Sequence, residues 1–364
     1  MNIVLAGGGT AGHTSPLIAT AQQLQRLAPE SSLLCIGTPR GLETRVIPEA
    51  GLELALIPPV PLPRRLTPEL AAVPGRLRGA VREAARLLQR HKAEVVVGFG
   101  GYVSLPVYLA ARRARLPIVL HEQNAVPGLA NRVAARFSRY VAVSFPDTRL
   151  PSARYLGLPV RDAIATLDRA AARPAARAGF GITNDLPVLL VSGGSQGARS
   201  INTALAGAVD ALLAAGINVV HVLGAGNFTD DHVQRGDNLT GAVYLPLPYV
   251  DAMEQAYAAA DLMVGRSGAG TVMETAMVGL PTVFVPLPHG NGEQARNARF
   301  LVEADAALLV ADSDLSPDLL AATVIGLIRQ PGRLATMSST CRELVPSGAA
   351  EALAELVLQA GKGE

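Results

Sequence analysis

The sequence predicts an α/β protein of two doubly wound domains, each a mostly parallel sheet covered by helices. Short apolar strands alternate with helical stretches almost throughout the 364 residues, and this alternation restarts near the middle of the chain. The length suits two domains, and an apolar content of 49% is enough for two cores. We therefore expect two Rossmann-like halves facing each other across a cleft, with ligands at the carboxyl ends of the strands.

The first half, residues 1–162, is expected to form the N-terminal domain. Its apolar runs predict strands at Ile3–Ala6, Leu33–Ile36, Leu54–Ile57, Val95–Gly98, Ile118–Leu120 and Tyr140–Val143. Helical patterns between them predict helices at Pro16–Leu27, Pro68–His91, Leu105–Ala114 and Asn131–Phe137.

The second domain is expected over residues 163–340, entered through Arg169–Gly179, a segment rich in Ala and Arg. Its predicted strands are Val188–Val191, Val219–Leu223, Leu262–Val264, Thr282–Pro286 and Ala307–Val310. Its predicted helices are Ser200–Ala214, Thr271–Val278 and Glu293–Glu303. We expect residues 341–364 to form a C-terminal helix that packs back on the first domain.

Composition and charge narrow the classes of protein. The two cysteines, Cys35 and Cys341, form neither a disulfide framework nor a metal site, which suits a reducing compartment. The N-terminus is typical of a first strand rather than a signal peptide, and no apolar run is long enough to span a bilayer. Residues 1–162 carry 20 basic against 10 acidic residues, while the remainder carries 12 against 20. This asymmetry predicts an anionic partner for the first half: a membrane surface, a phosphorylated acceptor or nucleic acid.

Two glycine-rich loops, each between a strand and a helix, are typical of phosphate binding. The first reads GGGTAGH and ends at His13, and the second reads SGGSQGAR and contains Ser195. Such loops let the backbone approach an anion, and the following helix supplies unpaired N–H groups. The first loop also fits the G-x-G-x-x-G pattern, and Arg40 could receive a 2′-phosphate, so an NADP enzyme stays open. Two phosphate-type loops favour an enzyme with two phosphorylated substrates, although a tight turn without a ligand has the same pattern.

Three further segments follow predicted strands and carry polar groups. His121-Glu122-Gln123-Asn124 suits the recognition of hydroxyl groups or a structural network, and a metal site is disfavoured because no second His follows at helical spacing. The turn from Arg266 to Glu274 could hold a diphosphate, with Glu274 on the ribose, although a solvent-facing Glu fits equally. The loop from His289 offers Gln294 to sugar hydroxyls.

One predicted helix is basic and amphipathic. Arg78, Arg82, Arg86 and Arg90 recur every four residues beside an apolar stripe, Leu77, Val81, Ala84 and Leu88. Any outer helix of a doubly wound sheet has an apolar stripe, but the excess of charge favours docking on an anionic membrane surface. We expect no nucleic acid partner, because aromatic stacking residues are missing around the basic run.

Taken in order, seven motifs resemble the MurG family of GT-B glycosyltransferases, from Gly7 to about residue 297. They are GGGTAGH, GFGGYVSLP, HEQNAVPGLAN, GLPVR, GGSQGA, RSGAGTVMETAMVGLP and EQARNA. The resemblance implies the GT-B fold and inverting transfer of N-acetylglucosamine from UDP-N-acetylglucosamine to the 4-hydroxyl of the N-acetylmuramyl sugar of lipid I. The product would be lipid II of peptidoglycan, made by a peripheral enzyme at the cytoplasmic face of the membrane.

The resemblance also implies roles for individual residues. Glu274 would bind the ribose, and the main chain near Val250 would read the uracil. Ser195 and the turn formed by Ala269, Gly270, Thr271, Val272 and Met273 would lie along the diphosphate. Asn124 and Gln294 would bind the sugar, Arg161 would sit near the phosphates, and Thr10, Ala11 and Gly12 would close over donor and acceptor. Two positions depart from some members, with Ala11 in place of Gly and Glu293 in place of Gln.

For the mechanism we expect His13 to be the general base, with Glu122 as second candidate, because an imidazole titrates near neutral pH. Helix N-termini at Ser195 and Ala269 would stabilise the departing UDP, so we expect neither a catalytic metal nor a cofactor. The alternatives are a GT-B-fold UDP-sugar epimerase and an NADP-dependent oxidoreductase. A catalytically silent membrane scaffold is disfavoured by the two phosphate-type loops.

Overall fold

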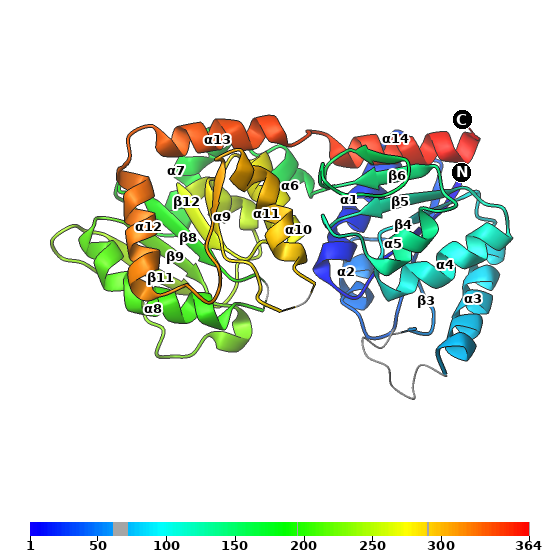
Figure 1. The fold of residues 1–364 in the computed structure, drawn as a ribbon, viewed down its shortest axis with the longest axis horizontal. Helices are drawn as coiled ribbons and strands as arrows, with labels where there is room; N and C mark the ends of the chain where they lie inside the picture. Colours follow the sequence, from blue (N-terminus) through cyan, green and yellow to red (C-terminus); the bar gives the residue numbers. More distant parts are fainter. Residues whose placement is uncertain (61–71, 195, 290, 364) are drawn as a thin grey trace. The chain divides into compact units, whose positions relative to one another are not determined.

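A computed structural model describes residues 1–60, 72–194, 196–289 and 291–363, and these form two compact α/β units (Figure 1). Unit 1 contains Met1–Arg161 together with Gly348–Glu364, and unit 2 contains Asp162–Ser347. The predicted class, two Rossmann-like domains each with a parallel sheet, is therefore confirmed.

Unit 1 has a seven-stranded, fully parallel sheet in the order β3-β2-β1-β4-β5-β6-β7. The strands are β1 (Asn2–Ala6), β2 (Ser32–Gly37), β3 (Leu54–Leu56), β4 (Val95–Gly98), β5 (Ile118–Glu122), β6 (Tyr140–Val143) and β7 (Ala153–Tyr155). The strand order reverses between β1 and β4, so the loops that follow these two strands leave the sheet side by side. In open α/β sheets this reversal is the usual place for a ligand.

Helices cover both faces of this sheet, because its strands are apolar along their whole length. On one face α3 (Val73–Arg90), α4 (Gly101–Arg113) and α5 (Leu129–Ala134) bury side chains such as Leu88 and Val107. On the other face lie α1 (Ala11–Leu27), α2 (Glu43–Glu49) and α14 (Ala349–Lys362). Leu353 and Val357 of α14 are fully buried in the same cluster as Leu17 and Leu24 of α1.

Unit 2 has a second seven-stranded sheet in the order β10-β11-β9-β8-β12-β13-β14. Its strands are β8 (Val188–Ser192), β9 (Asn218–Val222), β10 (Arg235–Gly236), β11 (Val243–Leu247), β12 (Leu262–Gly265), β13 (Thr282–Phe284) and β14 (Ala307–Leu309). All pairings are parallel except that of β10 with β11. The order reverses between β8 and β12, so the loops after these strands leave the sheet side by side, as those after β1 and β4 do in unit 1.

The helices of unit 2 begin with two short elements, α6 (Asp162–Ala165) and α7 (Arg169–Gly179). The others are α8 (Arg199–Ala214), α9 (Met253–Ala259), α10 (Ala269–Met277), α11 (Glu293–Glu303), α12 (Pro317–Arg329) and α13 (Arg333–Leu344). The segment interpreted as an entry linker is thus a helix, begun by an Asp168 side chain that accepts from Ala171 N at 3.1 Å. The last part of the chain holds two helices, and only α14 belongs to unit 1, since α13 lies within unit 2.

Helix α1 begins five residues before the predicted start at Pro16. Pro16 lies inside the helix, where a proline removes one backbone hydrogen bond without ending the element in this case. As a result His13 lies in the first helical turn rather than in the glycine loop. Helix α3 begins at Val73, and its predicted start at Pro68 falls outside the described residues. No helix in the described ranges is both long and apolar enough to cross a bilayer.

Candidate functional site

The loops after β1 and β4 meet at His13. His13 Nδ1 lies 2.9 Å from Thr10 Oγ1, and a Cβ built on Gly100 would lie 3.6 Å from His13 Nε2. Gly100 and Gly101 have φ values of +80° and +79°, which favour glycine, and a Cβ on Gly101 would lie 2.9 Å from the carbonyl oxygen of Gly8. Side chains at these two positions would force the loops apart, so the glycines allow the imidazole to sit between them.

The surroundings of His13 suit a neutral imidazole. Burial lowers the pKa of His13, and the negative charge of Glu43 raises it in part, with a net result below the ordinary value. The Thr10 hydroxyl can accept a hydrogen bond from Nδ1–H, which leaves Nε2 as the basic nitrogen. Such a group can take a proton at neutral pH.

Glu43, which sequence reasoning missed, anchors the first glycine loop. Its side chain is fully buried at the start of α2 and accepts from Gly9 N at 2.8 Å, Thr38 N at 2.9 Å and Thr38 Oγ1 at 2.8 Å. Burial raises the pKa of Glu43, but these hydrogen bonds together lower it by more than burial raises it. The pKa of Glu43 therefore lies below its ordinary value. A buried carboxylate therefore joins the ends of β1 and β2.

Glu122, at the end of β5, is also a buried anchor. Its carboxylate accepts from Asn124 N at 3.0 Å, Gly128 N at 2.9 Å and Asn131 Nδ2 at 3.0 Å. Asn131 in turn accepts from the hydroxyl of Tyr108 at 2.7 Å. These contacts fix the loop between β5 and α5, and they favour a positioning role for Glu122.

The rest of the polar run after β5 divides into buried and accessible groups. His121 is fully buried, its Nε2 lies 3.1 Å from Gly157 O, and burial lowers its pKa to about 4. Gln123 is buried and donates to Phe99 O at 2.6 Å. Asn124 is half-buried, so it is the member of the run that a ligand can reach.

In unit 2 the loop after β8 is braced by the segment after β9. A Cβ on Gly197 would lie 1.9 Å from Leu223 O, and Asn227 Nδ2 donates to Gln196 O at 2.8 Å. Gly197 has a φ of +71°, which together with this close contact requires glycine. Ser195, the predicted phosphate donor, lies outside the described residues.

The loop after β12 leads directly into α10 and ends at the predicted ribose ligand. Gly268 is the N-cap of α10, and the backbone N–H groups of its first turn lack helical partners. Ala269, Val272 and Met273 are buried, while Gly270 and Thr271 are half-buried. Glu274 is half-buried and accepts from the hydroxyl of Tyr257 on α9 at 2.8 Å. Tyr257 was missed because α9 itself is not apparent from the sequence pattern.

Arg266 holds the β12 loop through a partly buried charge cluster. Its Nη1 donates to Val285 O and Pro286 O, both at 3.1 Å, and forms a short ion pair with Asp312. Ser200 Oγ donates to Asp312 Oδ1 at 2.6 Å. Burial raises the pKa of Asp312, but the bonds from Ser200 and Arg266 lower it further, so this carboxylate is ionised.

The expectation of no metal was reached as if the chain had no Asp-x-Asp triplet, but Asp312-Ser313-Asp314 is one. Asp312 is already neutralised by Arg266, and Asp314 is exposed and accepts from Ser313 Oγ at 2.9 Å. In the described part of the chain, no group of three or more His, Cys, Asp or Glu side chains could hold a metal ion.

The remaining predicted ligands are spread over loops of the two units. Gln294 accepts from Leu287 N at 3.0 Å, so its side-chain oxygen shapes the loop before α11. Val250 is half-buried in the loop after β11, and Arg161 is exposed at the end of unit 1. Thr10 and Gly12 are exposed at the start of α1, and Ala11 is its first residue.

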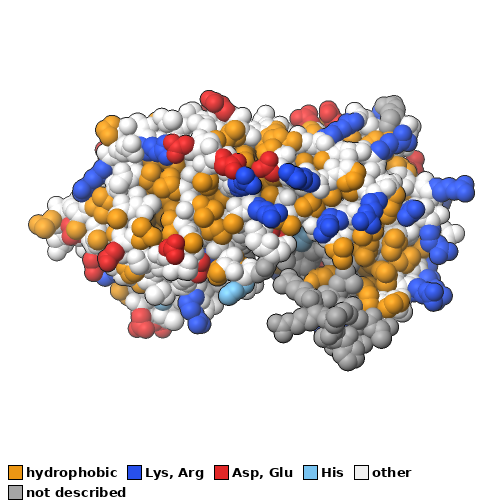
Figure 2. Space-filling view, in the orientation of Figure 1, with side chains coloured by type: hydrophobic (Ala, Val, Ile, Leu, Met, Phe, Trp, Pro, Cys, Tyr) orange, Lys and Arg blue, Asp and Glu red, His pale blue; other side chains and the backbone are white. Residues whose placement is uncertain are grey.

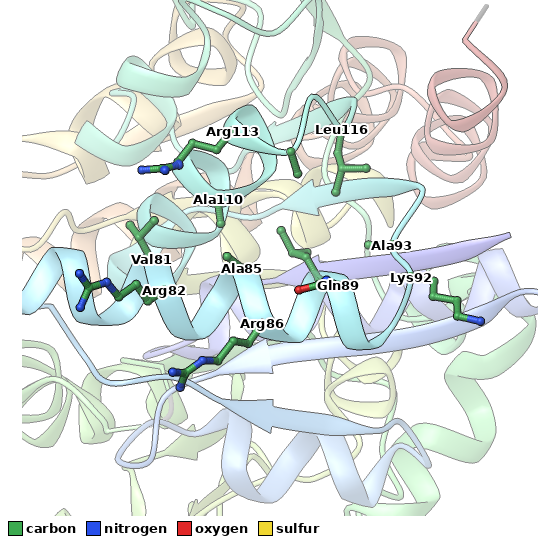
Figure 3. A pocket seen from close by; sticks show the side chains of 12 residues that line it. Val81, Arg82, Ala85, Arg86, Gln89, Lys92, Ala93, Ala110, Arg113 and Leu116 are labelled. Carbon is green, nitrogen blue, oxygen red and sulfur yellow. The ribbon is translucent and has the colours of Figure 1, made fainter.

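Two adjoining grooves run along α3 and α4. The first, of about 780 Å³, is lined by Arg82, Arg86, Lys92 and Arg113 around apolar side chains such as Val81 and Leu116 (Figure 3). The second, of about 710 Å³, adds Arg78 and Arg112, and none of the described residues that line either groove is Asp or Glu. Figure 2 shows Lys and Arg side chains spread among hydrophobic ones over unit 1. The four arginines of the predicted stripe, Arg78, Arg82, Arg86 and Arg90, are all exposed.

Known proteins similar to this chain match along its whole length. A transferase from Cutibacterium acnes is 58% identical over 99% of this chain and 97% of that protein. One from a Nocardioides species is 55% identical over 100% and 99%. Both are named UDP-N-acetylglucosamine–N-acetylmuramyl-(pentapeptide) pyrophosphoryl-undecaprenol N-acetylglucosamine transferase.

Solved structures agree with this picture. MurG of Acinetobacter baumannii is 29% identical, with a TM-score of 0.78 over 98% of this chain and 99% of that one. The glycosyltransferase of kitacinnamycin has a TM-score of 0.71 at 17% identity, which is a likeness of fold alone. The N-terminal domain of glycosyltransferase family 28 matches residues 3–143, and the C-terminal domain of that family matches residues 188–354. Since these matches cover most of both units, the chain belongs to glycosyltransferase family 28.

Proposed function

We propose that this chain is an inverting glycosyltransferase that moves N-acetylglucosamine from UDP-N-acetylglucosamine to the 4-hydroxyl of the N-acetylmuramyl sugar of lipid I, forming lipid II. Relatives up to 58% identical over nearly their full length carry the name of this transferase. The observation that carries the proposal is the loop after β12, where helix N–H groups without partners inside the helix lie within two turns of the Tyr257–Glu274 pair. This arrangement suits the diphosphate and ribose of a nucleotide sugar.

Unit 2 provides the donor site in this proposal. Glu274 accepts from the ribose hydroxyls, and the Tyr257 hydroxyl holds its carboxylate in place. The first turn of α10 and Ser195 bind the diphosphate, and the main chain near Val250 reads the uracil. Gln294 and Asn124 contact the sugar, and Arg161 lies near the phosphates.

Unit 1 provides the acceptor site and the general base. Thr10, Ala11 and Gly12 close over the substrates, and His13 Nε2 takes the proton of the acceptor hydroxyl. His13 is favoured over Glu122, because three hydrogen bonds hold the Glu122 carboxylate inside the protein and stabilise its ionised form. General-base assistance of this kind contributes about 10²- to 10⁴-fold to the rate.

The reaction is a single displacement at the anomeric carbon. The acceptor oxygen bonds to this carbon from the face opposite UDP, and the bond to the β-phosphate oxygen breaks with its electron pair, so the configuration inverts. Negative charge grows on the leaving UDP, and the positive end of the α10 dipole stabilises it. No cofactor or metal takes part in the proposed steps.

A direct assay tests the proposed reaction. Labelled N-acetylglucosamine should move from its UDP donor to a short-chain lipid I analogue, with equal rates in the presence and absence of EDTA. A UDP-sugar epimerase would instead change the donor without any acceptor, and an NADP-dependent oxidoreductase would bind NADPH. The names of the relatives support transfer over both alternatives.

We further propose that the enzyme is peripheral to the cytoplasmic face of the membrane and docks through the grooves of α3 and α4. Six cations line these grooves around apolar side chains, and each cation near an anionic surface adds about 1 kcal/mol. Sedimentation with vesicles tests this directly. Binding should require anionic lipid and weaken with salt, and equal binding to neutral and anionic vesicles would contradict it.

A further inference from the structure

The proposed mechanism leaves one buried ionised group of unit 1 without a role. Glu43 is completely buried, yet hydrogen bonds lower its pKa despite burial, so it carries its charge inside the protein. Burying a carboxylate is costly unless it is hydrogen-bonded, and both of its oxygens are bonded here. Neutral groups could close the same loop at a smaller desolvation cost, so a buried charge at this position suggests a role beyond closing the loop.

The neighbouring backbone is shaped around this carboxylate. A Cβ on Gly8 would lie 2.4 Å from Glu43 Oε1, and one on Gly41 would lie 1.8 Å from Oε2. A Cβ on Gly37 would lie 2.6 Å from Glu43 Cγ. Three glycines, from the β1–α1 and β2–α2 connections, therefore leave the space that the side chain occupies. Two of them, Gly37 and Gly41, flank the Thr38 donor, and the third belongs to the first glycine loop.

Glu43 is linked to His13 by contact and by charge. It accepts from Gly9 N, and the next residue, Thr10, contacts His13 Nδ1 at 2.9 Å. Its negative charge raises the pKa of His13 against the effect of burial. Among the described residues packed against His13, those of the β4 loop are Gly100 and Gly101, which carry no charge. Within the part of the chain that the structure describes, Glu43 is thus the charged group that acts on His13.

We propose that Glu43 is a positioning residue for sugar transfer, which holds the first glycine loop and, through Thr10, orients and polarises the His13 imidazole. The proposal rests on the proposed role of His13 as general base. Glu43 itself touches neither substrate. Three strand–helix connections therefore meet here. Glu43 joins the β1–α1 and β2–α2 connections, and the β4–α4 connection packs against His13.

The test replaces Glu43 by Gln in the full chain and measures two independent quantities. We expect kcat to fall about 10- to 100-fold, as small displacements of catalytic groups commonly cause. The KM for UDP-N-acetylglucosamine should change little, because the proposed donor site is mostly in unit 2. The pKa of His13, followed by NMR with side-chain labelling and assigned with His13→Gln, should fall, because the neighbouring negative charge is gone.

Glu49→Gln is the matched control, because it removes the same charge from the same helix. Glu49 is exposed and its carboxylate lies 3.7 Å from Arg45 Nη1. It should leave kcat and the His13 titration unchanged. If Glu43→Gln also leaves both unchanged in the folded protein, Glu43 is only a structural residue and the proposal is overturned.

Thr38→Val provides a second test of the role of Glu43. If Glu43→Gln yields too little folded protein, Thr38→Val removes one donor to the carboxylate and keeps the charge. It should lower kcat severalfold at an unchanged KM for the donor, and a wild-type kcat would overturn the proposal. Failure of the wild-type enzyme to transfer sugar would contradict the proposed function instead, whereas the NMR titration still reports on the coupling of Glu43 to His13.

Discussion

The loop after β1 and the loop after β12 have the same strand–loop–helix construction but are anchored by opposite charges. The first is held by the buried anion Glu43 and leads to His13, whose pKa lies below its ordinary value. The second is held by the cation Arg266 and leads to Glu274, which accepts a hydrogen bond from Tyr257. The difference suits the two tasks in the proposed reaction. An anion supports a group that must gain a proton, whereas an arginine paired with Asp312 holds the loop that is proposed to face the diphosphate.

The comparison makes its strongest prediction for His13→Ala. Loss of the general base should lower kcat by about 10²- to 10⁴-fold and leave UDP binding by calorimetry unchanged. The matched control is His232→Ala in unit 2, where the imidazole contacts Thr229, and its turnover should be near normal. Near-normal turnover of His13→Ala would show that the first loop does not supply the base.

Glu274→Ala should have the opposite effect, a loss of UDP affinity with a smaller change in kcat. Hydrogen bonds to charged groups contribute about 1.5–3 kcal/mol, so UDP should bind about 10- to 100-fold more weakly. Turnover at saturating donor should change less. Glu303→Ala is the control, because this exposed carboxylate pairs with Arg299 on the neighbouring helix α11. If Glu274→Ala lowered kcat alone, the division of labour between the two loops would be wrong.

Removing only the Tyr257 hydroxyl should have a smaller effect in the same direction. Tyr257→Phe deletes the 2.8 Å bond to Glu274 and keeps the buried ring. This bond acts on UDP only through Glu274, so its loss should weaken UDP binding less than Glu274→Ala does. A loss of about 0.5–1.5 kcal/mol corresponds to an affinity about two- to tenfold lower. Calorimetry with UDP measures this change. A wild-type affinity would mean that the carboxylate of Glu274 needs no support from α9.

The pH dependence should locate the base without any substitution. Burial lowers the pKa of His13 and Glu43 raises it in part, with a net value below 6.5. Since the base must be neutral, kcat/KM should be constant around pH 7 and fall as the pH drops through this lowered pKa. The rate should be measured from pH 5 to 8 with folded protein verified at each point. A loss of activity already above pH 6.5 would contradict the assignment.

Local sequence patterns predicted the glycine loops and most strands of both sheets, but they did not predict β7, β10 and β11. Apolar runs followed by glycine, as at Val95–Gly98, predict where strands end, and the structure agrees. Helices shorter than two turns, such as α2 and α9, were not predicted, because so short a segment shows no clear helical periodicity. Helix α12, with its Pro317 at the start, was overlooked although its Ser316 cap is typical.

The site residues hardest to predict were those whose contacts join positions far apart in the sequence. Glu43 meets Gly9 over 34 positions, and Tyr257 meets Glu274 from a helix that was not foreseen. The one local signal for the role of Glu43 was the pair of glycines before it, Gly37 and Gly41. Glycines of this kind mark places where the backbone approaches a side chain closely. The substrate roles of Glu274, Asn124 and Gln294 stay predictions, to be tested by the binding measurements.

Helix α14 has a consequence for the order of events during synthesis. It follows all of unit 2 in the sequence, yet Leu353, Val357 and Ala360 fill the core of unit 1, and a Cβ on Gly361 would touch the sulfur of Met1. On the ribosome, unit 2 can therefore gather all of its strands while the earlier-made sheet of unit 1 still exposes an apolar face. Unit 1 is thus translated first but completed last, because its core closes only when α14 packs.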